Sequence, residues 1–139
     1  MLDKLITFKY IIHGGGKLMM HKIRFYKDRR GKRPVADYIK GLAEKKDKDS
    51  RIKLEKINDY MQILQQYGTH IGEPYVKHLD GDIWELRPLR DRILFAAWDG
   101  QGFILLHHFV KKTQKTPPQE IKQAKHNLTD YRERSRNDG

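Results

Sequence analysis

The second half of the chain alternates apolar and polar residues with a period of two, and this pattern restricts the fold more than any other feature. It predicts four strands, at residues 76–79, 83–87, 92–98 and 103–110. The connections are short, and Gly81-Asp82 and Asp99-Gly100 are dipeptides typical of tight turns. Strands joined in this way pair as an antiparallel meander.

Helical periodicity dominates the segment before the meander. Apolar residues recur every three or four positions in two stretches, first at Val35, Tyr38, Ile39 and Leu42, then at Leu54, Ile57, Met61 and Leu64. Pro34 suits a first helical turn, Ser50 is expected to cap the second helix, and Gly68 is expected to end it. The short connection predicts an antiparallel helical hairpin.

A strand at residues 22–27 precedes the hairpin, and a last helix begins near Thr116-Pro117-Pro118-Gln119. We expect Thr116 to cap this helix and Gln119 to return the bond. The order of elements predicts an α+β fold: a mainly antiparallel twisted sheet of about five strands, an N-terminal helical hairpin and a C-terminal helix. We expect the helices on one face of the sheet and the other face open.

The length of 139 residues predicts one domain. We place it at residues 20–132, followed by a flexible polar tail at 133–139. Residues 1–19 form an N-terminal extension with two interpretations. In the first, the natural start is Met19 or Met20, and the extension lies upstream of it. In the second, the extension is a genuine N-terminal arm.

Composition narrows the classes of function. The chain has 29 Lys and Arg against 18 Asp and Glu, a net charge of +11, which indicates a polyanionic partner such as nucleic acid. The absence of cysteine excludes a disulfide scaffold, a cysteine-ligated metal centre and thiol catalysis. No stretch approaches the roughly 20 apolar residues that span a bilayer. We expect a cytoplasmic protein with no signal peptide and no membrane partner.

One segment concentrates positive charge. Residues 100–119 contain no Asp or Glu but do contain five basic or titratable residues: His107, His108, Lys111, Lys112 and Lys115. Arg87, Arg90 and Arg92 belong to the neighbouring strands and their connection, so we expect these groups to converge in one concavity. A solvated basic strand end is the alternative interpretation.

Strand alternation orients some of these side chains. Trp84 and Leu86 are expected to face the helices, which leaves Glu85 and Arg87 on the open face. Glu85 is expected to pair with Arg87 or Arg90. His107 and His108 must point to opposite faces, and the pattern leaves open which one joins the site.

The basic cluster suits RNA cleavage by the substrate's own 2′-hydroxyl. This reaction needs a base, an acid and positive charge for the transition state. Arginine binds two phosphate oxygens, and a lysine among other cations acquires a lowered pKa. The sequence shows no carboxylate cluster typical of two-metal nucleases, so we expect neither a metal nor a cofactor.

Three stretches together resemble the HigB branch of the RelE/ParE toxin superfamily, which is often labelled phage-derived. They are Ile83-Trp84-Glu85-Leu86-Arg87, Arg92-Ile93-Leu94-Phe95 and the run from Leu105 through His107-His108-Phe109-Val110-Lys111-Lys112 to Pro117. The resemblance implies a toxin that cleaves mRNA on the ribosome without metal. It also implies a helix-turn-helix antitoxin, HigA-like, which binds operator DNA.

The same resemblance assigns roles to residues. It implies that Arg87 stabilises the transition state, that Arg92 binds phosphate, and that His107, Lys111 and Lys112 complete the catalytic group. We expect Arg90, His108, Lys115 and Lys77 to bind RNA. His108 stands where the family usually has glycine. Two alternatives to the endonuclease are a non-catalytic RNA- or ribosome-binding module and an inactive phage-derived homologue.

Overall fold

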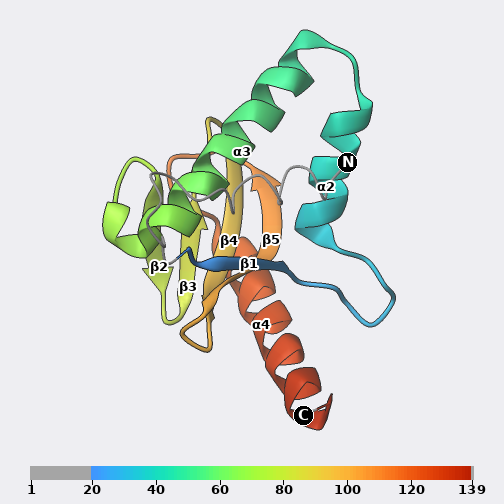
Figure 1. Ribbon diagram of the computed structural model, residues 1–139, viewed down its shortest axis with the longest axis vertical. Coiled ribbons are helices and arrows are strands. Elements are labelled where there is room, and N and C mark those ends of the chain that lie inside the picture. The colour runs from blue at the N-terminus through green and yellow to red at the C-terminus, as the bar shows by residue number, and fades with distance from the viewer. Residues whose placement is uncertain (1–19, 139) are drawn as a thin grey trace, which may run out of the picture.

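The computed structural model describes residues 20–138, so the predicted N-terminal extension lies outside the described residues (Figure 1). The elements follow in the order β1 (Lys22–Phe25), α2 (Pro34–Glu44), α3 (Lys48–Tyr67), a 3-10 turn (Gly68–Ile71), β2 (Val76–Asp80), β3 (Ile83–Leu86), β4 (Asp91–Trp98), β5 (Gly102–Val110) and α4 (Pro118–Asp138). The predicted α+β fold and its order of elements are confirmed.

The five strands form one sheet in the order β1-β5-β4-β3-β2. Strands β2 to β5 are an antiparallel meander, as their turn sequences predict. The first strand pairs with the last one in parallel, with Lys22 opposite Gly102 and Phe25 opposite Leu105. The helical hairpin therefore carries the chain from one edge of the sheet, at β1, to the other edge, at β2 (Figure 1).

The ends of helix α3 differ partly from the prediction. Asp47, not Ser50, is the N-cap, and its carboxylate accepts bonds from the Ser50 amide at 3.0 Å and the Ser50 hydroxyl at 2.8 Å. The expected cap was wrong because an acceptor must lie before the first helical turn to reach a free amide, and Ser50 already lies within that turn. Gly68 does end the helix, with φ of 66° and its amide bonded to the Leu64 carbonyl.

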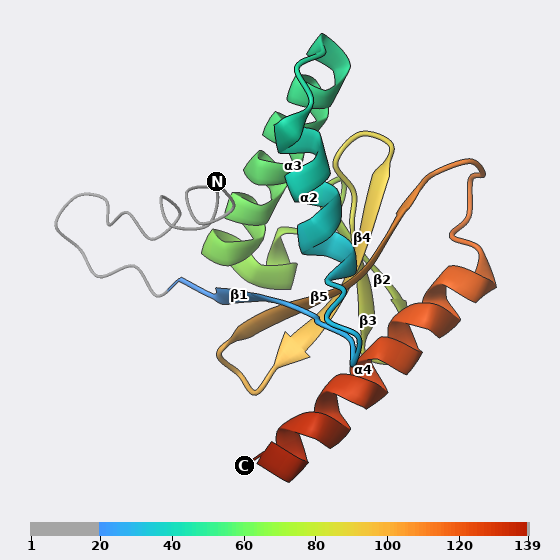
Figure 2. The ribbon, with the colours of Figure 1, turned by 90° about the vertical axis from the view of Figure 1, so that its right-hand side faces the viewer.

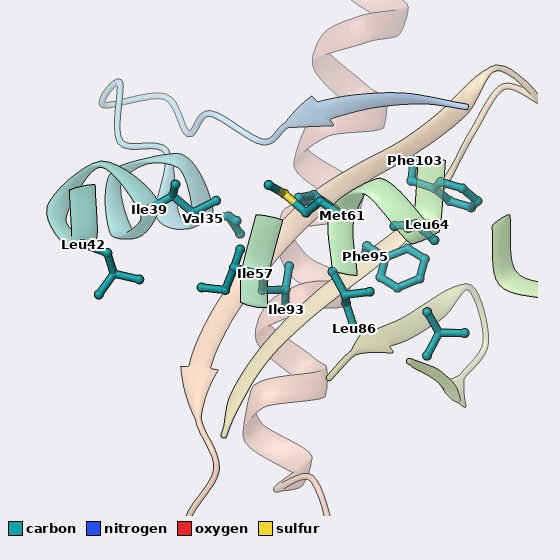
Figure 3. Close-up of a cluster of buried hydrophobic side chains, with 12 residues drawn as sticks. Val35, Ile39, Leu42, Ile57, Met61, Leu64, Leu86, Ile93, Phe95 and Phe103 are labelled. Atoms are coloured by element: carbon teal, nitrogen blue, oxygen red, sulfur yellow. The ribbon is translucent and has the colours of Figure 1, made fainter. Parts of the chain in front are cut away.

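Helices α2 and α3 cover one face of the sheet. Side chains from both helices pack on Leu86, Ile93, Phe95 and other sheet residues in one buried cluster (Figure 3). Helix α4 covers the opposite face, where Ala124 and Leu128 lie over Leu94 and other sheet residues. Figure 2 shows α4 on the side of the sheet away from α2 and α3.

The expectation that all helices share one face was therefore wrong. Strands β4 and β5 are apolar on both faces, so that consecutive residues such as Leu94 and Phe95 are both fully buried. Strands buried on both sides require cover on both sides. The continuous apolar runs at 93–97 and 103–106 were the signal for a second layer.

Helix α4 extends through Asp138, so residues 133–138, which we placed in a polar tail, are helical. Arg132 is 3.1 Å from Asp82, and Arg134 is 2.8 Å from Asp130 and also donates to the Lys27 carbonyl. None of the helices within residues 20–138 is long and apolar enough to cross a membrane.

Candidate functional site

The candidate site lies on the α4 side of the sheet, at the strand ends near the β3–β4 turn. Trp84 and Leu86 pack toward α2 and α3, which confirms the predicted alternation, so Glu85 points to the opposite face. Lys77 on β2 is the register partner of Glu85 and shares its face. The adjacent strands β2 and β3 thus both contribute to this surface.

A buried carboxylate is at the centre of the site. The Glu85 side chain is 2% exposed, and its Oε1 lies 3.5 Å from Arg87 Nε and 3.8 Å from Arg92 Nε. Its other oxygen, Oε2, accepts a hydrogen bond from the Thr116 hydroxyl. Burial of an ionised carboxylate requires such compensation. Glu85 pairs with Arg87, as expected, but its second partner is Arg92 and not Arg90.

Arg87 remains partly accessible. Its Nη1 donates to Glu73 Oε1 at 2.9 Å, and its side chain is 21% exposed. Glu73 itself is largely exposed, and an exposed carboxylate is readily displaced by a competing anion. Among the arginines of this surface, Arg87 therefore combines a buried anchor with an open side.

Arg92 is more buried, and more fully bonded to the backbone, than a phosphate-binding role requires. It is 6% exposed, and its Nη1 donates to the carbonyls of Leu89 at 2.8 Å and Asp91 at 2.9 Å. Burial lowers the pKa of Arg92, although Glu85 opposes this effect. Leu89 has a positive φ of 56°, so Arg92 holds the β3–β4 turn in a conformation that is unfavourable for leucine.

The residues from Lys111 to Pro117, here called the lysine loop, connect β5 to α4 and swing out from the sheet before they return to it (Figure 2). At the first end, the Lys111 amide donates to the Arg90 carbonyl at 2.7 Å, and the Arg90 guanidinium donates to the Lys111 carbonyl at 2.9 Å. At the other end, the Thr116 hydroxyl binds Glu85. The loop is thus attached at both ends to β3 and the β3–β4 turn.

Thr116 does not cap helix α4, so this prediction was wrong. Its hydroxyl donates to Glu85, and the Pro117 carbonyl accepts the first helical bond from the Glu120 amide at 3.0 Å. Proline has no backbone N–H, so a helix that begins with proline has fewer free N–H groups that need an acceptor. The Thr116 side chain is therefore available for a long-range contact.

The exposed lysines of this surface have no carboxylate partner. Within residues 20–138, Lys77, Lys112 and Lys115 form no ion pair. Lys112 and Lys115 are exposed in the lysine loop, whereas Lys111 is half-buried beside Arg90. The positive charge predicted from the sequence at this end of the chain is therefore available to an anion.

The two histidines point to opposite faces, as predicted, and the structure decides between them. His107 lies on the α4 side, where its Nε2 donates to Glu120 at 2.8 Å. His108 lies on the α2 side, where its Nε2 donates to Asp91 at 3.0 Å and its ring stacks on Tyr38. His107, not His108, shares the face of Arg87.

The larger hollows of the surface lie elsewhere. A cavity of about 490 Å³ is lined by Tyr26, Arg29 and neighbouring residues of α4, and one of about 360 Å³ lies beside Trp98 and Tyr131. The candidate site lines neither of them. Within residues 20–138, His, Asp and Glu side chains form no group of three or more that could hold a metal ion.

The fold and this surface define a class: a small basic α+β protein of RelE-like architecture with an open cationic sheet end. Residues 37–129 match the family model described as Phage derived protein Gp49-like (DUF891), which covers most of the chain. The chain belongs to this family, which is related to the RelE-like toxins. A search of curated proteins found no match.

Proposed function

We propose that the protein is the toxin of a type II toxin–antitoxin system, of the HigB type, and that it cleaves mRNA on the ribosome. The observation that carries this proposal is the attachment of the lysine loop, through Thr116 and Glu85, to the sheet face that bears Arg87. Membership of a toxin-related family supports the same conclusion. The net charge of +11 supports a partner made of RNA.

The proposed chemistry follows from the types of side chain on this face. The 2′-hydroxyl of the substrate attacks the adjacent phosphate, the 5′-oxygen leaves, and negative charge accumulates on the phosphoryl oxygens between these events. Arg87 stabilises that charge, because its guanidinium stays protonated and presents two parallel donors. Lys112 and Lys115 hold the RNA backbone. His107 and the lysines are the candidates for proton transfer.

The structure changes the roles that we assign to the other two arginines. Arg92 and Arg90 each donate to backbone carbonyls, so we assign them to the support of the β3–β4 turn and the lysine loop. This observation also favours a second candidate function, a non-catalytic RNA- or ribosome-binding module, in which the lysines alone contact phosphate.

The proposed partners are those of a translation-blocking toxin. They are the ribosome with its bound mRNA, and a helix-turn-helix antitoxin that neutralises the toxin and binds operator DNA. Exposed lysines without carboxylate partners suit RNA and also suit an acidic segment of an antitoxin. A gene for a helix-turn-helix protein beside the toxin gene is the expected genetic context.

Induced expression in bacteria tests the proposal. The wild-type protein should arrest growth and produce messages cut within translated regions, as mapped by sequencing of 5′ ends. Arg87→Ala should abolish both effects and retain the wild-type circular dichroism spectrum. Lys56→Ala, which removes an exposed cation from α3, is the matched control and should remain toxic. Growth arrest with intact messages would establish the binding module instead, and harmless expression of folded protein would establish an inactive homologue.

A further inference from the structure

We propose that Glu85 and Thr116 form a positioning pair that sets the lysine loop relative to Arg87. The pair touches no substrate in this proposal and acts through the residues it holds. Its effect on RNA cleavage rests on the proposed function, whereas its effect on the order of the loop does not.

The two carboxylate oxygens of Glu85 contact different partners. Oε1 lies beside the guanidinium groups of Arg87 and Arg92, at 3.5 and 3.8 Å, and Oε2 accepts the bond from Thr116. A carboxylate is rigid and planar, so a rotation that weakens the contact with one side also disturbs the other. Thr116, 31 positions away in sequence, is therefore coupled to the arginines through one buried group.

The contact is not needed to begin helix α4. Pro117 and Pro118 begin the helix, and the Pro117 carbonyl accepts the amides of Glu120 and Ile121 at 3.0 and 3.4 Å. The Thr116 hydroxyl instead satisfies a carboxylate that is 2% exposed. A polar contact to a buried carboxylate fixes the relative position of two distant segments, because water has little access to the carboxylate as a substitute partner.

The opposite end of the loop has its own anchor. Arg90 and Lys111 exchange two hydrogen bonds, at 2.7 and 2.9 Å. Between the two anchors, the Thr113 hydroxyl donates to the Lys115 carbonyl at 2.7 Å and forms a local turn. Lys112 and Lys115 are thus exposed but attached to a restrained backbone. A restrained loop loses less conformational entropy when it binds a phosphate backbone.

Three variants distinguish a positioning role of the Thr116 hydroxyl from a contribution to stability alone. Thr116→Val keeps the shape and loses the hydroxyl, Thr116→Ser keeps the hydroxyl, and Thr129→Val makes the same change at an exposed position of α4. The backbone order parameters of residues 112–116, measured by ¹⁵N relaxation, should fall in Thr116→Val alone. Single-turnover cleavage of ribosome-bound mRNA should fall on the order of tenfold in Thr116→Val at saturating ribosome, since small displacements at a site have large rate effects. Thr116→Ser should keep both the wild-type order parameters and the wild-type cleavage rate.

Two results would overturn the proposal: wild-type order parameters in the loop of Thr116→Val, or lowered order parameters with a cleavage rate equal to that of Thr129→Val. If the wild-type protein itself does not cleave RNA, the proposed function fails. The positioning role of Glu85 and Thr116 is then tested by the loop order parameters and by binding of a single-stranded RNA oligonucleotide, both of which Thr116→Val must change.

A second variant covers failure of Thr116→Val to fold. Arg90→Ala removes the guanidinium bond to the Lys111 carbonyl, keeps the backbone bond from the Lys111 amide, and leaves the buried carboxylate intact, since Arg90 is exposed. The ¹⁵N order parameters should then fall near residue 112, while residues 115 and 116, held through the Thr116 hydroxyl by Glu85, should keep their wild-type values. Lowered order parameters along the whole loop would show that Thr116 and Glu85 do not anchor it, and would overturn the proposal.

Discussion

The ring of Tyr38 on helix α2 stacks on the imidazole of His108 on strand β5, with the ring centroids 3.6 Å apart. Both residues donate to the same oxygen, Oδ1 of Asp91, the Tyr38 hydroxyl at 2.7 Å and His108 Nε2 at 3.0 Å. Burial and the bond to Asp91 raise the pKa of Tyr38. Burial acts to raise the pKa of Asp91 as well, but the bonds from His108 and Tyr38 outweigh it and lower that pKa.

This cluster joins helix α2 to the first residue of β4, so its loss should destabilise the fold. We expect Asp91→Ala to reduce the free energy of unfolding by about 2–4 kcal/mol, because it leaves a buried hydroxyl and an imidazole without their acceptor. Urea unfolding at neutral pH measures the change. Asp59→Ala on the exposed side of α3 is the control and should stay close to wild type. An equal effect of both substitutions would contradict the importance of the cluster.

Acid should remove the contribution of Asp130. The hydrogen bond from Tyr26 is the main cause that lowers the pKa of Asp130 to about 2, burial opposes it, and Arg134 and Arg29 add to the lowering. A lowered pKa stabilises the fold above the unfolded-state pKa near 4, and this contribution disappears as the pH falls toward 2.

Asp130→Asn should therefore cost about 1–2 kcal/mol at pH 7, a value reduced for the screening of its arginine partners by solvent. The difference from wild type should shrink between pH 4 and pH 2 in denaturant titrations. Asp59→Asn is the matched control. A difference that stays constant over this pH range would show that the carboxylate charge is not responsible.

Two glycines should respond in opposite directions to the same substitution. At Gly102, a Cβ would lie 1.9 Å from the Lys22 carbonyl oxygen, because β1 approaches β5 closely there. Gly102→Ala should destabilise the protein by about 2 kcal/mol or more through separation of this strand pair. At Gly41, inside α2, a Cβ would meet nothing within 4 Å, so Gly41→Ala should stabilise by about 0.5–1 kcal/mol. Thermal unfolding of both variants measures these two opposite changes in stability.

Lys112 should contribute to RNA binding through charge. We expect Lys112→Ala to weaken binding of a single-stranded RNA oligonucleotide and to reduce the slope of log K against log salt by about 0.7, the value for one lost phosphate contact on single strands. Lys56→Ala is the control on α3, and its slope should match that of the wild type. Equal slopes for all three proteins would exclude Lys112 from the interface.

Local patterns predicted most of the fold and part of the site. The turn dipeptides and the period of two located the meander, since a side chain's face depends only on its position along the strand. The same rule placed Glu85 and Arg87 together and separated His107 from His108. The pattern could not locate the caps of α3 and α4, because Asp47, Ser50 and Thr116 are all suitable caps by residue type, and the path of the backbone selects among them.

The amino-acid sequence by itself determined the strands, the helices, their order and the concentration of positive charge after β5, because periodicity and composition are local properties. The tertiary structure alone decided that α4 covers the second face, that β1 joins β5, and that Arg90 and Arg92 support backbone. Partners separated by tens of residues are brought together by the packing of layers, and the same arginine can bind a carbonyl or an anion. Which of the two an arginine binds depends on the groups that the fold of the rest of the chain places beside it.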